Sequence, residues 1–320
     1  MITIARVTSL ATALALALVC GCGDDEPTNP SAGGAGGTSS VGGSVGGSAG
    51  AGGSGGSGGT GGSAGSGGAG ASPSCAVLLH DDDFEDGDYL DTFAQNENTG
   101  AVKVVSTTDG AEPYAGDSCL RGNFRIGHTD PVTQLAATSR YTGMEIPLGG
   151  IHGFQVSVRY RIDPDAEWIM DDGNDTGLGY KFFYLRGTPW NNTLNWVTAQ
   201  LWGPDHWWFG DNQPNDNTGY NTAQNVDSSQ AELGAWHHIE IVAVLNSAPG
   251  ATDGRYRLRV DSVTVHDLDD VPWQTSTEQT FGNLGGVPHM YGGCCGPKNP
   301  WGWQIDDLRV WELPEGCLPP

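Results

Sequence analysis

The chain has 320 residues and a formal net charge of −24 at pH 7, with 38 acidic residues against 14 lysines and arginines. This charge argues against a nucleic acid partner, and it disfavours a polyanionic glycan because the mean field would repel it. The 51 glycines exceed the share of an ordinary globular domain, so part of the chain cannot belong to such a domain. The 37% hydrophobic content still suffices for one good-sized core.

The N-terminus has the pattern of an export signal. Arg6 gives a short positive region, and Leu10 to Val19 is an apolar run too short to span a bilayer comfortably. The run ends in VCGC, which resembles a bacterial lipobox, although valine stands where leucine is usual and a cysteine where alanine or serine is common. The resemblance implies a signal peptide over residues 1–21 and lipidation of Cys22; simple secretion is the alternative. We therefore expect the protein in the bacterial cell envelope, anchored by lipid at the outer membrane or cell surface.

A low-complexity segment follows the signal. From Ser31 to about Ser72 the sequence is almost only glycine, serine, alanine and threonine. Such a segment cannot bury enough apolar surface to offset its ordering entropy. We expect residues 22–74 to be a flexible tether, whose low-complexity part has an average reach of roughly 35 Å. The folded domain is then expected over residues 75–320.

Strand patterns dominate this domain. Apolar and polar residues alternate over Phe154 to Ile162, over Leu194 to Trp202 and over Tyr256 to Val260. A period of two with one wet face is typical of antiparallel sheets. Clusters such as NSAPGATDG separate the strands as turns, and no amphipathic helix longer than about two turns is visible. The pattern predicts a single all-β domain built as a two-sheet sandwich.

The stretch WHHIEIVAVLN, Trp236 to Asn246, places two histidines side by side. Strand alternation puts His237 on the face of Ile239, and it puts His238 on the opposite face together with Glu240. The two imidazoles therefore cannot reach one metal ion from the same face. The spacing also differs from the His-Glu-x-x-His of helical zinc enzymes, so we interpret the stretch as a strand.

The strand and the hairpin after it, WHHIEIVAVLNSAPGATDGRYRLRVDSVTVHDLDDV, resemble paired strands of the concanavalin A-like lectin/glucanase superfamily. They are most similar to its polysaccharide-lyase-like branch, with Ser262 where glycine is usual. The pieces DDDFEDGD, YRIDPDAEW followed by GYKFFYLRG, and WQIDDLRVW occur in the same order as in that branch. The resemblance covers most of Asp81 to Trp311 and implies a two-sheet antiparallel jelly-roll β-sandwich. It implies less about activity, because the fold hosts lectins, enzymes and inert modules.

In this superfamily the first and last strands lie side by side. The resemblance therefore implies a disulfide between Cys75 and Cys317, which bracket the domain, and an exported protein permits it. Cys119 is expected to pair with Cys294 or Cys295, unless these two vicinal cysteines bond to each other.

A structural Ca²⁺ often lies near the terminal strands of this superfamily. Carboxylates are suitable ligands, and Asp83, Glu85 and Asp306 are the candidates here. The alternative is a solvated acidic turn. No other cofactor is expected.

A candidate carbohydrate-binding face follows from the strand at 194–202. Trp196, Thr198, Gln200 and Trp202 alternate with residues suited to a core. Flat rings and hydrogen-bonding groups on one face fit the apolar faces and polar edges of sugar rings. Tyr184 and Arg186 form part of a similar row on GYKFFYLRG, and the following loop adds Trp207. We expect a monomer that binds a polysaccharide or glycoconjugate through a concave aromatic face, unless these rings fill the core.

Catalysis is the alternative function. The chain lacks the Glu-x-Asp-x-x-Glu strand of retaining glucanases of this fold, which disfavours a glycoside hydrolase. Lys181 matches a lysine common in the lyase-like branch, which implies a lyase that uses Lys181, Tyr184 and His206. Strict alternation, however, places Lys181 and Tyr184 on opposite faces, and only a bulge would bring them together. A structural surface protein without a ligand is the third possibility.

Overall fold

The computed structural model describes residues 75–95, 101–123, 125–138, 144–167, 179–188, 195–202, 206–211, 221–225, 232–285, 289–291, 298–299 and 301–317. For many residues of the strands between positions 179 and 225, and for 289–291, only the backbone is described. The expected signal peptide, the lipidation site Cys22 and the tether lie outside the described residues.

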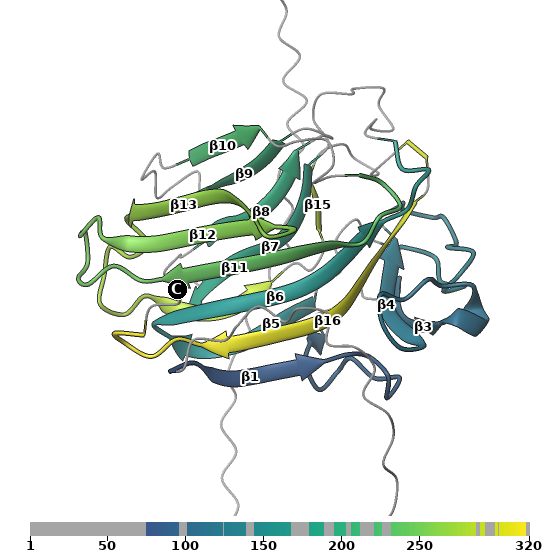
Figure 1. The fold of residues 1–320 in the computed structure, drawn as a ribbon, viewed down its shortest axis with the longest axis horizontal. Coiled ribbons are helices and arrows are strands. Elements are labelled where there is room, and N and C mark those ends of the chain that lie inside the picture. The colour runs from purple at the N-terminus through teal and green to yellow at the C-terminus, as the bar shows by residue number, and fades with distance from the viewer. Residues whose placement is uncertain are drawn as a thin grey trace, which may run out of the picture. The chain divides into compact units, whose positions relative to one another are not determined.

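The first sheet contains eight strands within the described residues, in the order β13-β12-β11-β6-β16-β4-β3, with β1 paired to β16 (Figure 1). Every pairing is antiparallel. The bounds are β1 Val77–Asp82, β3 Val102–Ser106, β4 Ser118–Asn123, β6 Gly153–Ile162, β11 His237–Val244, β12 Gly254–Val260, β13 Val263–Val271 and β16 Gly302–Glu312.

The second sheet has the order β10-β9-β8-β7-β14-β5-β2, and β15 pairs with β7. It is antiparallel as well. Its strands are β2 Ala94–Gln95, β5 Met144–Ile151, β7 Gly179–Thr188, β8 Asn195–Trp202, β9 His206–Asp211, β10 Asn221–Asn225, β14 Thr280–Gly285 and β15 His289–Tyr291. The one helical element in the described ranges is the 3₁₀ turn η1, Thr107–Asp109. The expected all-β, two-sheet antiparallel jelly roll is confirmed.

The core lies between the two sheets, where the apolar residues of each strand's inner face meet. Aromatic rings make the contacts from sheet to sheet. Phe209 of β9 stacks on Tyr256 of β12 with ring centroids 3.7 Å apart, and Phe281 of β14 meets Phe154 of β6 edge-on at 5.1 Å. Both arrangements are favourable for aromatic pairs, so these contacts fix how the second sheet sits on the first. Among the described residues, no helix has the length and apolar character needed to cross a membrane.

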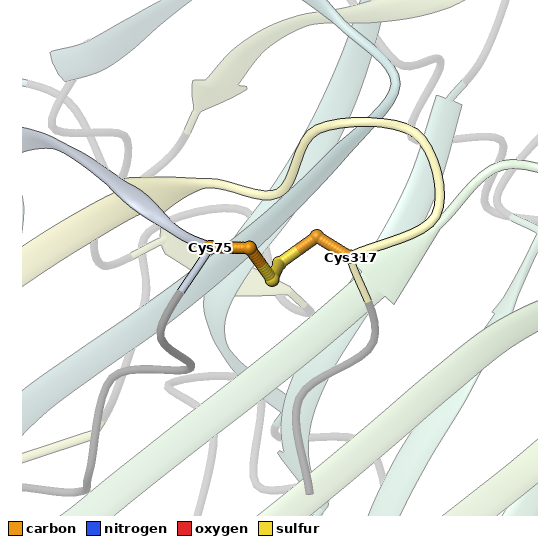
Figure 2. Close-up of a disulfide and its surroundings, with 2 residues drawn as sticks. All are labelled: Cys75 and Cys317. Atoms are coloured by element: carbon orange, nitrogen blue, oxygen red, sulfur yellow. A yellow bond between two sulfur atoms is a disulfide. The ribbon is translucent and has the colours of Figure 1, made fainter.

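The terminal strands confirm the expected clasp. β1 pairs with β16, and Cys75 forms a disulfide with Cys317 across a Cα–Cα distance of 5.8 Å (Figure 2). Cys119 behaves differently from its prediction, because its thiol is free and buried. The Cys119 Sγ donates to Oε1 of Gln304 at 3.3 Å, and burial raises the pKa of this thiol to about 12. The pairing of Cys119 with Cys294 or Cys295 is therefore wrong. The alternative, a bond between the two vicinal cysteines, stays a prediction because both lie outside the described residues.

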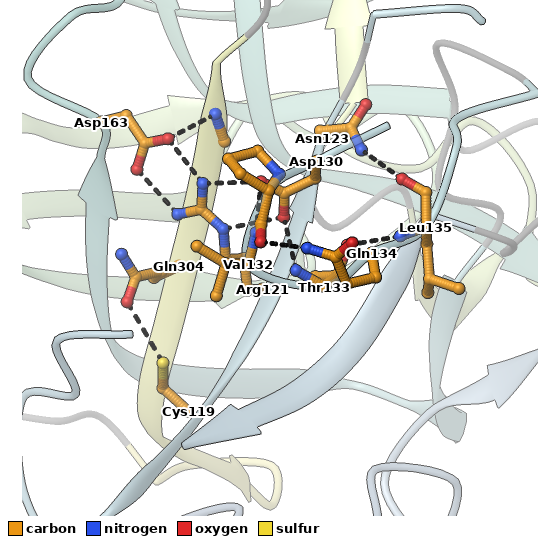
Figure 3. Close-up of polar contacts among 12 residues, drawn as sticks. Cys119, Arg121, Asn123, Asp130, Val132, Thr133, Gln134, Leu135, Asp163 and Gln304 are labelled. Carbon is orange, nitrogen blue, oxygen red and sulfur yellow. Dashed lines mark hydrogen bonds and ion pairs between the residues drawn. The ribbon is translucent and has the colours of Figure 1, made fainter. Parts of the chain in front are cut away.

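A buried ion network around Arg121 of β4 connects this strand to the segments beside it (Figure 3). The Arg121 guanidinium binds Asp130 through Nε and Nη2, at 2.9 and 3.0 Å, and Asp163 through Nη1 and Nη2, at 2.8 and 2.7 Å. The Gly302 N–H donates to Asp163 at 2.7 Å. A side chain at Gly302 would collide with the guanidinium, since a Cβ there would lie 2.4 Å from Nη2 of Arg121. The network joins the start of β16, the end of β6 and the loop after β4.

Candidate functional site

The three expected calcium ligands each accept backbone N–H groups. Asp306 is buried in β16, and its Oδ2 accepts the backbone N–H groups of Tyr114 and Ala115 at 2.9 and 3.2 Å. Burial raises the pKa of Asp306 to about 7, although these N–H groups and that of Asp307 act in the opposite direction. A carboxylate held in this way anchors the loop before β4.

Glu85 and Asp83 have the same kind of role. Oε1 of Glu85 accepts the N–H groups of Asp117 and Ser118 at 2.8 and 2.9 Å, and Oδ1 of Asp83 accepts the N–H of Glu85 at 3.2 Å. Within the described part of the chain, no group of three or more histidine, cysteine or acidic side chains could hold a metal ion. The calcium prediction is not supported, because the carboxylate oxygens bind backbone amides instead.

The two histidines of WHHIEIVAVLN separate as alternation predicts. His237 stacks on the core ring of Tyr160, with centroids 5.2 Å apart. His238 bonds through Nε2 to Ser157 Oγ at 2.7 Å, and Glu240, on the same face of the strand, pairs with Arg259 at 3.5 Å. Burial, and then nearby arginines, lower the pKa of His238 to about 4. At pH 7 this histidine is therefore neutral, and its hydrogen bond to Ser157 joins β11 to β6.

The predicted binding residues lie on β7, β8 and β9 of the second sheet. For Tyr184, Arg186, Trp196, Trp202, Lys181 and His206 the structure describes the backbone only. The register places Trp202 of β8 opposite both Gly179 of β7 and His206 of β9. It also places Gln200 of β8 between Lys181 of β7 and Trp208 of β9.

His289 of β15 stands opposite Lys181 on the other side of β7. One row of backbone positions therefore crosses four strands, from His289 through Lys181 and Gln200 to Trp208. We call these four positions the central row. No pattern in the sequence indicates His289, because β15 is only three residues long and too short to show a period.

An irregularity in β7 removes the objection raised by strict alternation. Phe182 and Phe183 are consecutive and both fully buried in the core. The pairing of β7 with β8 shifts register on either side of Phe183. Alternation therefore breaks between Lys181 and Tyr184, and counting residues no longer separates them. Short of an aligned family, no sequence signal marks such a bulge.

Trp207 is a core residue, contrary to its predicted place on the binding face. It belongs to β9 rather than to a loop, and its ring is fully buried. The ring lies 5.4 Å from that of Phe182 and 6.2 Å from that of Tyr160, between centroids. Trp207 and Phe209 alternate into the core, which the pattern Trp-Trp-Phe could have indicated. The Trp207 ring is not available to stack on a ligand.

Gln200 has an unusual environment. Its neighbours Ala199 and Leu201 are in the core, so alternation directs Gln200 to the outer face of the second sheet. Its side chain is nevertheless only 2% exposed, and its Nε2 finds no hydrogen-bond partner in the structure. An unsatisfied buried donor costs roughly 1–3 kcal/mol. Such a group on an outer face is suited to a ligand that supplies the missing acceptor.

Comparison with known proteins gives structural likeness only. No family profile and no curated protein matches the chain. Among solved structures, the endo-β-1,4-glucuronan lyase of the fungus Trichoderma reesei is similar at 14% identity, over 75% of this chain and 95% of that chain, with a TM-score of 0.43. The cellulose-induced protein Cip1 is similar at 11% identity, over 75% and 100%, with a TM-score of 0.45. The alginate lyase vAL-1 from a Chlorella virus is similar at 9% identity, over 68% and 91%, with a TM-score of 0.44. Likeness of this degree carries no argument about what this chain binds.

Proposed function

We propose that this domain binds a polysaccharide across the outer face of its second sheet, at the central row. We further propose that a lipid on Cys22 and the tether of residues 22–74 hold the domain at the bacterial cell surface. The domain would then capture a glycan at a distance from the membrane.

The buried amide of Gln200 carries the binding proposal. Alternation directs this side chain away from the core, its Nε2 is buried without a partner, and a sugar hydroxyl or ring oxygen is an acceptor of the required kind. A hydrogen bond to the ligand would satisfy this donor and so favour the bound state. A sugar site needs a few well-placed polar groups of this type.

The residues around Gln200 have the composition that a sugar face needs. Trp202 belongs to the same strand as Gln200, and Tyr184 and Arg186 belong to the neighbouring strand β7. Trp196, also predicted for this face, is separated from Gln200 by a register shift and stands opposite the core residue Leu185, so its position does not continue the outer row. Rings cover the apolar faces of sugars, and the guanidinium and phenol can bond to their edges. A site formed by these residues would offer an extended glycan more than one contact.

A binding screen against neutral and acidic polysaccharides tests the proposal. We expect the wild-type protein to bind at least one glycan at physiological salt and Gln200→Ala to weaken that binding about tenfold. Gln155→Ala is a matched control, because Gln155 is also a buried glutamine with an unpartnered amide atom but belongs to the first sheet. The absence of binding to every glycan, or equal losses in both variants, would refute the site.

A second candidate function, polysaccharide lyase, is favoured by the break of alternation at Phe182 and Phe183 and by the position of Lys181 beside His289. In β-elimination a base takes the proton next to a uronate carboxylate, the electron pair forms a carbon–carbon double bond, and the glycosidic oxygen leaves with a proton. Lys181 would neutralise the carboxylate, and Tyr184 and His206 would move the protons.

The lyase is tested by the ultraviolet absorbance of unsaturated products during incubation with alginate, glucuronan and pectin. A lyase gives rising absorbance that Lys181→Ala abolishes. Binding without any rise supports the binding module alone. A structural protein without a ligand gives neither signal.

A further inference from the structure

The imidazole of His237 has an acceptor at each ring nitrogen. His237 is 3% exposed at the start of β11. Its Nδ1 lies 2.7 Å from Oδ2 of Asp261, and its Nε2 lies 2.9 Å from the carbonyl oxygen of Glu232. An ionised carboxylate and a carbonyl oxygen can only accept. Both contacts are hydrogen bonds only when the ring carries two protons.

The neutral ring cannot keep both bonds. With one N–H, it donates to one acceptor and turns a lone pair toward the other. The bond to Asp261 is the stronger one, because its acceptor is charged. Loss of the proton therefore breaks the contact with Glu232.

Asp261 is fixed in place to hold the ring. It begins the two-residue turn between β12 and β13, where Asp261 and Ser262 both have left-handed backbone conformations, with φ of 50° and 68°. Such conformations are costly for residues other than glycine and occur where the surroundings fix them. Oδ1 of Asp261 also accepts the N–H of His238 at 2.8 Å, and the N–H of Asp261 donates to the carbonyl of His238 at 2.9 Å. The carboxylate is thus held at β11 independently of the ring.

Glu232, in contrast, belongs to the connection from β10 of the second sheet to β11 of the first. Within this connection, the N–H of Gly234 donates to the carbonyl of Ile162 at 2.8 Å, and Nε of Arg161 donates to the carbonyl of Gly234 at 2.8 Å. The His237 bond to Glu232 closes the same segment against β11. A ring that releases Glu232 loosens the segment that leads to β10.

His237 also has a packed route to the central row. Its ring stacks on Tyr160, whose ring lies 4.3 Å from that of Phe182, between centroids. Phe182 directly follows Lys181 of the central row, and Trp207, which packs on both rings, directly precedes Trp208. A continuous series of aromatic contacts therefore connects His237 to β7 and β9.

We infer that His237 is a proton-operated latch: the protonated ring ties the 232–236 connection to β11 and the turn at Asp261, and its deprotonation releases the connection and weakens glycan binding at the second sheet. The effect on binding rests on the proposed function; the latch itself does not.

The charged groups around the ring agree with this direction. Burial alone would lower the pKa of His237, but the bonds to Asp261 and to the carbonyl of Glu232, and then the charges of both residues, outweigh it and raise the pKa. Tyr160 faces the ring from β6 and stays neutral, since burial raises its pKa well above the ordinary value. Arg159 acts on Asp261 and favours its ionised form. The latch is closed at acidic pH and opens as the pH rises through the pKa of the folded protein.

The first test needs no ligand. Nuclear magnetic resonance of the ring nitrogens, from about pH 5 to about pH 9, is combined with the exchange protection of the Gly234 amide. We expect two ring protons at low pH, and a roughly tenfold fall in protection as the ring loses one. Asp261→Asn should move the midpoint to lower pH by about one to two units, whereas His238→Gln should leave it in place. The latch is contradicted if the ring carries one proton at every pH, or if the exchange protection of the Gly234 amide stays constant while the ring titrates.

The second test measures affinity for the best glycan of the screen below and above that midpoint. We expect weaker binding above it in the wild type and a flat profile in His237→Phe, which keeps a ring against Tyr160 but cannot titrate. A wild-type profile that is flat while the ring titrates, or a pH dependence that persists in His237→Phe, overturns the coupling to the second sheet. Absence of binding at every pH refutes the proposed function and leaves the latch to the first test.

Discussion

Removal of the Arg121 guanidinium should cost a large part of the stability of this domain. Arg121→Met keeps the length of the side chain but leaves Asp130 and Asp163 without their cation (Figure 3). The guanidinium makes four hydrogen bonds, all of 3.0 Å or less, and the Asp130 side chain is only 2% exposed. Breaking a buried pair by removing one partner costs about 3–5 kcal/mol, because the remaining charge stays buried. We expect a loss of that size.

Urea unfolding followed by tryptophan fluorescence measures the effect as a lower midpoint with an unchanged slope. The pH dependence provides a second readout. Burial raises the pKa of Asp130, but the hydrogen bonds and charge of Arg121 outweigh it and lower the pKa below its ordinary 3.8. The stabilisation is therefore present above that value and is lost as the pH falls through the lower folded-state pKa. Arg121→Met should lose this acid-dependent step.

A triple variant, Arg121→Met with Asp130→Asn and Asp163→Asn, separates the two causes of the loss. With no charge left behind, it should recover part of the stability that the single variant loses. A cost of less than about 1 kcal/mol for Arg121→Met, which is the range of an exposed pair, would contradict a buried ion network that stabilises the fold. So would a triple variant that is less stable than the single one.

Three further predictions concern the terminal clasp, the strained turn and the latch. Replacing Cys75 and Cys317 by alanine opens a link between residues 242 positions apart, and chain entropy predicts a loss of about 5 kcal/mol in denaturant unfolding, whereas a loss under about 1 kcal/mol would contradict it. Ser262→Gly should raise the stability by about 1 kcal/mol in the same assay, because glycine adopts the left-handed conformation without strain; a decrease would show that the serine side chain is needed. The raised pKa of His237 means that its stabilisation is full below the ordinary value of 6.5 and is lost as the pH rises through the folded-state pKa. The melting temperature of the wild type should therefore fall over that range relative to His237→Phe, and parallel profiles would contradict the assignment.

The sequence predicted what depends on period and on chain order. The stretch from Trp236 to Asn246 is interpreted as a strand and contains β11, His237–Val244, and alternation separates its two histidines correctly. The disulfide between Cys75 and Cys317 followed from the resemblance, because neighbouring terminal strands leave little choice of partner. Where a period or a strand order determines which residues are neighbours, the sequence is enough to predict their contacts.

The remaining features depend on local irregularity or on pairing across long separations. The irregularity at Phe183 of β7 breaks the alternation that placed Lys181 and Tyr184 on opposite faces, and no feature of the sequence marks it. Trp207 was assigned to a loop, although it is buried in a strand of the core. The partners of Arg121 lie 9 and 42 positions away, and no spacing rule connects them. Asp306 was assigned to calcium because a sequence does not show that its oxygens bind backbone amides.

The side-chain amide of Gln200 gives the most direct test of the proposed site. Its Nε2 resonance, assigned by its absence from Gln200→Ala, is followed while the best glycan of the screen is added to saturation. The proposal predicts a saturable shift of this signal, while the amide of Gln155 on the first sheet stays in place. A Gln200 signal that does not move at saturation, or a shift confined to Gln155, would contradict a binding site on the second sheet.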